Sequence, residues 1–504
     1  MQEDNKYYKI LKATYNHYLP YLTNNGDNEV QLIDPVDKKV IGFHYGETHM
    51  GVAFILGGVH FKNDAIRDMG YRIINGFVNH VTDYQKDPAY HWDFNNFALC
   101  VLYEYLDKTD VEFCKRIKKF IISQQDSNNA TINWYPMRLY VNWWKYQWTG
   151  EKKYKAIMCD FKKRISSAQY ADGYIEDLLP KGTSFNFQYH MFTTSLLAFL
   201  KLRDIDVANV SSAVSRTEDM MDYQGDINYL GRGNNQIFAW GPAIYLYSVL
   251  EDQTSYNKAI EYVYDRAFTS IENDNLILND FEGSDKNWWW DYHYCSVYIA
   301  HFIFWLMLAA IEQKKLPYKY EINNLSDSGV HIHKGNYCVV IFDGRRHYLA
   351  ESGKIIAGIT DRKGMCYFKG AFGPHYKEYG FKYAAPSDSF HNFIGIMKQE
   401  NIFGRFVQKP VYPDKIGIVE DNELVRISIK YKRNNRGIVN LPLFTETSRV
   451  KVFDGFGNEI FIRLNRVFKG PYGMVNLYQS GEITVDRIII EIGSMETNMK
   501  WGKS

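Results

Sequence analysis

The sequence predicts a multidomain α and β protein, in which an N-terminal (α/α) toroid, an incomplete barrel of helical hairpins, precedes an antiparallel β-sandwich domain. Three observations support this fold class. The chain has 504 residues, more than a single hydrophobic core usually holds. Apolar residues recur at helical spacing up to about residue 315. Beyond residue 328, short alternating runs are separated by Gly, Asn and Asp, which is typical of strands joined by tight turns.

The N-terminal part is expected to consist of antiparallel helical hairpins, because its periodic segments are joined by short polar loops. Ten to twelve such helices can close a ring, and the absence of a repeat period argues against a solenoid of identical units. The clearest helical segments are 64–81, 94–106, 111–123, 137–148, 152–166, 189–202, 207–223, 236–250, 255–267 and 296–312.

The C-terminal part is expected to be an antiparallel β-sandwich, because its apolar runs are short, alternating or rich in β-branched residues. The expected strands are 337–342, 354–359, 393–397, 415–419, 424–431, 449–453, 459–464 and 484–492. A linker near 315–327 separates the two patterns. We therefore predict a toroid domain at 1–317 and a β-sandwich domain at 328–504.

Charge and aromatic content indicate the class of ligand. The formal net charge is only +1, so no global field recruits nucleic acid or an anionic membrane. Tyr, Phe and Trp together make up 16% of the chain, and flat aromatic rings stack on the apolar faces of sugars. Coding bias explains part of this excess but not the runs Trp143-Trp144 and Trp288-Trp289-Trp290. We expect an acidic polysaccharide or oligosaccharide substrate, bound in a local basic site.

No cofactor or metal is expected. The six cysteines are scattered without zinc spacing, and phosphate-binding loops and nucleophile elbows are missing from the sequence. The apolar run at 298–310 is shorter than the ~20 residues of a membrane span. The N-terminus carries no visible signal peptide, which predicts a cytoplasmic protein, or an exported one if the sequence begins after a removed signal. The oligomeric state is left open.

Four polar and aromatic stretches fall at expected loop-to-helix boundaries, which gather on one rim of a toroid. In chain order they are Asn133-Trp134 followed by Arg138; Asp172-Gly173 leading to Gln188, Tyr189 and His190; Tyr229 and Gly231-Arg232-Gly233 followed by Asn235; and Trp288-Trp289-Trp290 followed by Asp291 and His293.

The pair Asp172-Gly173, followed by Tyr189 at the start of a Leu-rich helix, resembles the polysaccharide lyases that combine an α/α toroid with a C-terminal β-sandwich. These are the hyaluronate and chondroitin lyases, the alginate lyases and the heparinase II/III-like group. Asn133 beside an aromatic residue is similar to their carboxylate-neutralising Asn. The loop Gly231-Arg232-Gly233 is similar to their active-site Arg segment.

The resemblance implies an enzyme that cleaves a uronic-acid-containing glycan by β-elimination. The proton removed lies α to a carboxylate and is weakly acidic, so the carboxylate must first be neutralised. A base then takes the proton and an acid protonates the leaving oxygen. The implied catalytic set is Asn133 and Arg232 for the carboxylate, Tyr189 as acid and base, Tyr229 as a second tyrosine and His190 as a base or charge partner. The implied substrate-binding set is Trp134, Arg138, Gln188, Asn235, Trp289, Trp290 and His293.

The sequence departs from the lyase pattern at the base. In parts of that superfamily the Asn is followed by His, where this chain has Trp134, and the stretch 177–179 lacks the histidine that others carry before the tyrosine. The candidates for the base are therefore His190, His293, His49 and His91. Structural roles are also open: Asn133 is a good helix N-cap, and His190 could simply pack.

Two other functions stay open. A glycoside hydrolase on a similar toroid, including an unsaturated uronide hydrolase, needs two opposed carboxyl groups. The acidic residues available for that chemistry are Asp93, Asp172, Glu176, Asp177 and Asp291. A non-catalytic glycan-binding protein of an exopolysaccharide pathway would use the same aromatic residues without proton transfer. The C-terminal β-sandwich favours the lyase among the three.

Overall fold

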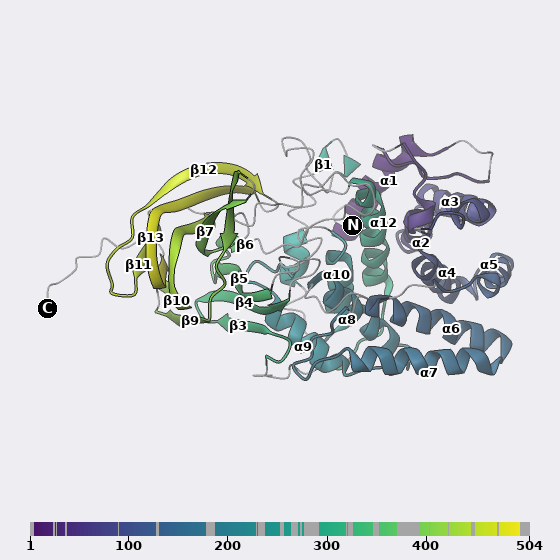
Figure 1. Ribbon diagram of the computed structural model, residues 1–504. Coiled ribbons are helices and arrows are strands. Elements are labelled where there is room, and N and C mark those ends of the chain that lie inside the picture. Colours follow the sequence, from purple (N-terminus) through teal and green to yellow (C-terminus); the bar gives the residue numbers. More distant parts are fainter. Residues whose placement is uncertain are drawn as a thin grey trace.

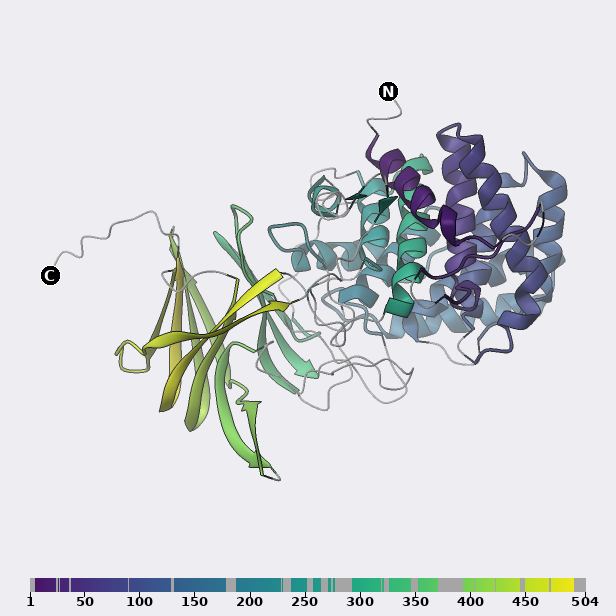
Figure 2. The same ribbon diagram turned by 90° about the horizontal axis from the view of Figure 1, so that it is seen from above.

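The helical part and the β-rich part lie side by side along the molecule (Figure 1), and the view from above keeps them apart in the same way (Figure 2). The computed structural model describes residues 5–493 with gaps at 24–25, 27, 36–37, 89, 128–130, 178–186, 228, 230–236, 252–256, 264–270, 273–274, 277–291, 319, 321–325, 346–351, 370–392, 403, 422, 445–448 and 471–472.

The helical part begins at α1 (Lys6–Tyr18) and ends at α12 (Tyr292–Ile311). Between them lie α2 (Gly46–His60), α3 (Asp64–Tyr84), α4 (Trp92–Leu106), α5 (Val111–Ser123), α6 (Tyr135–Thr149), α7 (Lys152–Ser167), α8 (Phe187–Lys201), α9 (Val210–Met220) and α10 (Trp240–Val249). A short 3-10 turn follows α1 at Leu19–Tyr21, and two others precede α2 and α6, at Gly42–His44 and Ile132–Trp134.

Six helices form an inner ring. Helix α2 packs against α4, α4 against α6, α6 against α8, α8 against α10, α10 against α12, and α12 returns to α2. The other helices of the hairpins, α3, α5, α7 and α9, pack outside their inner partners. This arrangement resembles an α/α toroid, and its contacts close around the ring, whereas the sequence predicted an incomplete barrel.

Each connection into an inner helix is longer than the connection that left the preceding inner helix. The chain leaves inner helices through 61–63, 107–110, 150–151 and 202–209, and enters the next ones through 85–91, 124–134, 168–186 and 221–239. Successive helices run antiparallel, as expected for hairpins with short connections. All the long connections therefore reach the same end of the ring, where the inner helices begin.

Close packing of α12 against α10 requires a glycine. A Cβ atom at Gly241 on α10 would lie 2.9 Å from both the Cα and the carbonyl oxygen of Phe302 on α12, and real Cβ atoms do not approach backbone atoms so closely. A Cβ atom at Gly57 on α2 would meet side chains instead, Cδ2 of Leu11 at 2.5 Å and the sulfur of Met307 at 2.7 Å. The backbone of α12 thus lies closer to α10 than any residue larger than glycine at position 241 would permit.

The β-rich part contains two antiparallel sheets. The first is four-stranded, with β3 (Val330–Lys334), β4 (Tyr337–Arg345), β5 (Ser352–Asp361) and β6 (Cys366–Lys369) in sequential order. The second is seven-stranded and is built on the long pair β10 (Leu424–Leu443) and β13 (Gly473–Gly493), with β7 (Gly395–Ile402), β8 (Arg405–Pro410), β9 (Lys415–Glu420), β11 (Val450–Asp454) and β12 (Ile462–Gly470). One hydrophobic cluster draws residues from both sheets, including Val339, Ile356, Ile427 and Ile490. A further two-stranded ribbon, β1 (Ile271–Glu272) and β2 (Asn275–Leu276), belongs to neither sheet.

The two parts share a buried interface. Tyr174, Phe187 and Tyr229 from the helical part join the first sheet in one hydrophobic cluster. Lys369 of β6 reaches back to Asp222 and Asp226, with Nζ–O distances of 2.7 and 2.9 Å, and all three side chains are at most 4% exposed. Burial alone would lower the pKa of Lys369, but the two carboxylates raise it well above its usual value. The lysine therefore stays charged inside the interface.

The sequence located most elements but not their extents. Helices α1 and α2 and strands β1, β2, β3, β6 and β8 were not among the segments it predicted. Strand β10 has 20 residues, where a run at 424–431 was expected. The predicted linker lies between the end of α12 and the start of β3. The domain limits at 317 and 328 stay a prediction. Within the described residues no helix is both long and apolar enough to cross a membrane.

Replacing Lys369 should destabilise the protein strongly. In Lys369→Met the carboxylates of Asp222 and Asp226 stay buried without their cation, a change that typically costs about 3–5 kcal/mol. Urea unfolding at pH 7 measures this loss. The control is Lys409→Met, which removes an exposed ion pair to Glu400 and should change the free energy of unfolding by about 0–1 kcal/mol. Equal effects of the two substitutions would contradict the assigned role of Lys369.

Candidate active site at one end of the helical ring

Aromatic side chains fill the inside of the ring at the end where the inner helices begin. Phe94 of α4 stacks on Tyr45 before α2, with ring centroids 4.3 Å apart, and on Phe192 of α8 at 5.7 Å. Phe238, just before α10, stacks on His301 of α12 at 4.2 Å. Three inner helices, and the residues just before two others, thus contribute to one aromatic cluster.

Two histidines and a tryptophan lie beside this cluster. The Nδ1 atoms of His44 and His91 are 3.2 Å apart, within hydrogen-bonding distance. The ring of His91 lies 5.6 Å from that of Trp134, which also contacts Phe94 at 6.1 Å. His91 is the N-cap residue of α4. Imidazole and indole groups from three separate connections therefore meet at this end of the ring.

The first turn of α8 directs Gln188 and Tyr189 toward the ring interior. They precede Phe192 by four and three residues, so they share its face of the helix. The ring of Tyr189 lies 6.4 Å from Phe238. Gln188 is fully buried, and neither its amide oxygen nor its amide nitrogen has a hydrogen-bond partner among the described residues. Such a buried amide is a candidate for binding a ligand.

A buried carboxyl group lies next to Asn133. The Asn133 backbone N–H donates to Oδ1 of Asp177 at 3.1 Å, and the Asn133 side chain donates to the Thr131 hydroxyl at 2.9 Å. Asp177 is 3% exposed, and its Oδ2 has no partner in the described part of the chain. Burial raises the pKa of Asp177 to about 6, although hydrogen bonds from Asn133 act in the opposite direction. The turn that carries Asn133 packs against α8, which bears Gln188 and Tyr189.

His190 faces away from the ring interior. Its Nδ1 accepts a hydrogen bond from the backbone N–H of Ile175 at 3.0 Å, so the proton resides on Nε2, 3.0 Å from the Thr217 hydroxyl. Its ring stacks on Tyr174 at 4.8 Å. Burial, followed by the charge of Arg216, lowers the pKa of His190 to about 3. These contacts support the structural interpretation of this histidine.

Tyr229 and Arg138 are also engaged elsewhere. The Tyr229 hydroxyl donates to the carbonyl of Met220 at 2.5 Å, and its ring belongs to the cluster between the helical and β-rich parts. Arg138 makes a bidentate buried ion pair with Asp93, at 2.9 and 3.2 Å.

Of the twelve residues that the lyase resemblance implies, Asn133, Trp134, Gln188 and Tyr189 lie together at the ring end. The side chains of Arg232, Asn235, Trp289, Trp290 and His293 lie outside the described residues.

The other acidic candidates already have partners. Asp93 is bound by Arg138, Asp172 accepts from Arg216, and Glu176 accepts from the Tyr170 hydroxyl at 2.6 Å. Asp291 lies outside the described residues. Among the described candidates, Asp177 is therefore the one with a buried carboxylate oxygen that has no hydrogen-bond partner.

Several residues of this end were not in the predicted site. His44, Tyr45, Phe238 and His301 join the cluster. The sequence signal for the first two was the run His44–His49, which spans the start of α2 and was not recognised as the start of an inner helix. Among the described residues, no three His, Cys, Asp or Glu side chains come together as metal ligands.

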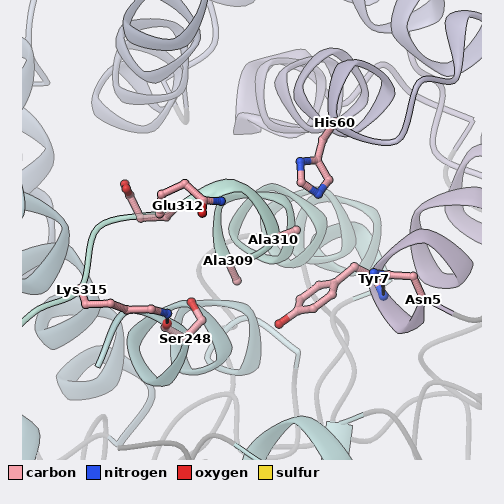
Figure 3. Close-up of a pocket in the computed structure, with 9 residues that line it drawn as sticks. Asn5, Tyr7, His60, Ser248, Ala309, Ala310, Glu312 and Lys315 are labelled. Carbon is pink, nitrogen blue, oxygen red and sulfur yellow. Dashed lines mark hydrogen bonds between the residues drawn. The ribbon is translucent and has the colours of Figure 1, made fainter. Parts of the chain in front are cut away.

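A pocket of about 310 Å³ lies at the opposite end of the ring, where α2, α10 and α12 end (Figure 3). Its lining includes Tyr7, His60, Ser248, Glu312 and Lys315. Its charged groups are already paired: Lys315 donates to the carbonyl of Ser248, and Glu312 accepts from Tyr105 and Arg203. The unpartnered polar groups favour the other end of the ring as the active site.

Comparison with known proteins gives likeness only to solved structures. No family model and no curated protein matches the sequence. The GH76A α-1,6-mannanase from Salegentibacter sp. HEL1_6 is 10% identical, with 61% of this chain and 99% of its own covered and a TM-score of 0.41. An unsaturated glucuronyl hydrolase from Streptococcus agalactiae is 10% identical, covering 62% and 91%, at 0.39. A family 76 glycoside hydrolase from Bacteroides thetaiotaomicron is 12% identical, covering 61% and 78%, at 0.40. At these sequence identities and TM-scores, the substrate and mechanism of this protein must be argued from its own residues.

The buried imidazole of His190 should make stability depend on pH. Its folded pKa of about 3 lies below the ordinary value near 6.5, so the unfolded chain binds the proton first. Its contribution is complete above pH 6.5 and decreases as the pH falls toward 3, by about 2 kcal/mol at pH 5. Chemical unfolding at pH 7 and pH 5 should therefore give a smaller difference for His190→Gln than for the unaltered protein. Thr217→Val, which keeps the imidazole, should be weakened at both pH values and retain the full difference.

Proposed function

We propose that this protein is a glycoside hydrolase that binds its glycan at the end of the ring where the inner helices begin, with Asp177 as the general acid. The observation that carries this proposal is the environment of Asp177. Its carboxyl group is buried, one oxygen accepts from Asn133, and the other has no partner among the described residues. A carboxyl group whose pKa is raised to about 6 holds its proton in mildly acidic solution, as a glycosidase acid must.

The chemistry assigns each neighbour a task. Asp177 donates its proton from Oδ2 to the glycosidic oxygen as the bond to the anomeric carbon breaks, while Asn133 holds Oδ1 in place. A second carboxyl group must face the anomeric carbon, as nucleophile or as the base that activates water. Asp291, which directly precedes inner helix α12 in the sequence, is the candidate we propose for it, because the other acidic candidates are bound to protein groups.

The surrounding side chains suit a sugar substrate. Trp134 is partly exposed and offers an aromatic surface, and Gln188 offers both a donor and an acceptor for ring hydroxyls. The N-termini of the inner helices add a positive potential at this end, which favours an acidic sugar.

We also propose that the β-rich part is a β-sandwich and that the two domains span 1–317 and 328–504. The hydrophobic cluster that draws on both sheets supports the sandwich.

A lyase is the second candidate, and one observation favours it. Asn133 and Tyr189 belong to two elements that pack together at this end, the pair that β-elimination needs for carboxylate neutralisation and proton transfer. Against it, His190 has both ring nitrogens engaged, and Tyr229 is bound to a backbone carbonyl at the domain interface.

Replacing the proposed acid should abolish most of the activity. On a panel of uronate-containing and neutral glycans, Asp177→Asn should lower kcat/KM by about 100- to 10,000-fold, because proton donation contributes that much. Asp291→Asn should have a comparable effect. The matched control is Glu176→Gln, which alters the adjacent carboxyl group and should leave activity near that of the unaltered protein. Reducing-end formation is the measurement.

The product separates hydrolase from lyase. A hydrolase releases saturated reducing ends, whereas β-elimination leaves a double bond conjugated to the carboxylate, which absorbs in the near ultraviolet. We expect reducing ends without new absorbance when the substrate is a polymer of saturated sugars. An absorbance increase that disappears in Tyr189→Phe would establish the lyase in its place, and binding without either product would exclude both enzymes.

The rate should fall as the pH rises through the pKa of the acid. Because Asp177 must be protonated and its pKa is raised to about 6, kcat/KM should decrease about tenfold per pH unit above pH 6. The residual activity of Asp177→Asn should lack this alkaline limb. An unchanged limb in the variant would assign the titration to another group.

A further inference from the structure

The loop that carries Asp177 is fastened to the start of the β-rich part. The carboxylate of Asp327 accepts hydrogen bonds from two successive backbone groups, the N–H of Ala171 at Oδ2 and the N–H of Asp172 at Oδ1, both at 3.0 Å. Asp327 lies just before β3, and its side chain is exposed. One exposed carboxylate thus fixes two consecutive peptide groups of a loop in the other part of the molecule.

The attachment is reciprocal. Oδ2 of Asp172 accepts from the Ser328 hydroxyl at 2.5 Å, from the Ser328 backbone N–H at 3.2 Å and from Arg216 at 2.9 Å. Arg216 also donates to the carbonyl of Val330 at 2.7 Å. The side chains of Asp172 and Arg216 are 0% and 3% exposed, so these bonds are protected from water. We call the set Asp172, Arg216, Asp327 and Ser328 the clasp.

The loop between the clasp and Asp177 is held in place by close packing and backbone hydrogen bonds. Gly173 adopts a positive φ of 91°, and a Cβ atom there would lie 2.2 Å from the carbonyl oxygen of Ser212, so the backbone rests directly on α9. The N–H of Ile175 is held by His190, and the N–H of Glu176 donates to the carbonyl of Ala168 at 3.0 Å. Asp177 follows at once. A shift at 171–172 therefore has no flexible residue in which to be absorbed.

We propose that Asp327 and Ser328 are positioning residues for catalysis, through which the β-rich part sets the placement of the Asp177 carboxyl group without touching the substrate. This rests on the proposed function of Asp177. Displacing a reacting group by about 1 Å can lower the rate 100-fold, so the contribution of the clasp should appear in kcat. Because Asp327 is exposed, its loss should affect the rate more than the stability of the protein.

The test compares Asp327→Ala with a matched control in the same part of the chain. Asp421 is also an exposed aspartate whose carboxylate accepts from two backbone N–H groups, those of Glu423 and Leu424, in a turn remote from the clasp. Asp327→Ala should lower kcat about 10- to 100-fold with KM nearly unchanged and should shift the alkaline limb of the pH profile. Asp327→Asn, which keeps one acceptor oxygen, should fall between. Asp421→Ala should leave kcat, KM and the pH profile unchanged.

Two further measurements distinguish a failure of this proposal from a failure of the proposed function. Amide hydrogen exchange at 171–177 should accelerate in Asp327→Ala but not in Asp421→Ala, whether or not the glycan panel contains a substrate. In the Asp177→Asn background, Asp327→Ala should lower the residual activity no further, because both substitutions act on one group. Three results would each overturn the proposal. The first is an unchanged kcat and exchange rate in Asp327→Ala. The second is a parallel loss of melting temperature and activity with an unshifted pH profile, and the third is additive losses in the double variant.

Discussion

The close packing of α12 between α2 and α10 is the contact on which the helical part depends. It closes the ring: Gly241 leaves room for the α12 backbone against α10, and Gly57 on α2 leaves room for the side chain of Met307 on α12. Closure brings the starts of the inner helices to one end, and the long connections meet there. Residues far apart in the sequence, such as Tyr45, Phe94, Phe192 and His301, become neighbours by this route. The site is thus a property of the closed ring and of no single hairpin.

Buried charges then join the helical ring to the β-rich part. Lys369 with its two aspartates and Arg216 with Asp172 are buried ion pairs. Each cation also donates a further hydrogen bond, Lys369 to the Gln224 side chain and Arg216 to the Val330 carbonyl. Such pairs add little net stability compared with apolar contacts, but they are strongly selective for one geometry. The hydrophobic cluster of the interface supplies the attraction, whereas the ion pairs fix the register between the two parts. The β-rich part therefore helps to hold in place the loop that carries Asp177.

The limits of the sequence prediction have physical reasons. Amphipathic helices such as α3, α5 and α7 were found because one face is apolar and the other polar, whereas α2 is buried on almost every side and shows no such alternation. The sequence predicted that loop-to-helix boundaries gather on one rim of the ring. Asn133, Trp134, Gln188 and Tyr189 lie together at that end. Neighbours in sequence nevertheless face different ways: Tyr189 points into the ring and His190 toward α9, because successive residues of a helix are turned by about 100°. The partners of the Asp172 Oδ2 atom, Arg216 and Ser328, lie more than forty residues away in the sequence, and no local pattern reveals such pairs.

Ring closure by the last inner helix also constrains how the chain is made. Helix α2 ends at residue 60 and α12 begins at residue 292. At ~5–20 residues per second, a ribosome needs roughly 10–50 s to supply the second after the first. Throughout that interval the apolar side of α2 that α12 will cover has no native partner. A nascent chain of this protein is therefore exposed to premature association for almost half of its synthesis, and chaperone occupancy should concentrate on α2 until α12 emerges.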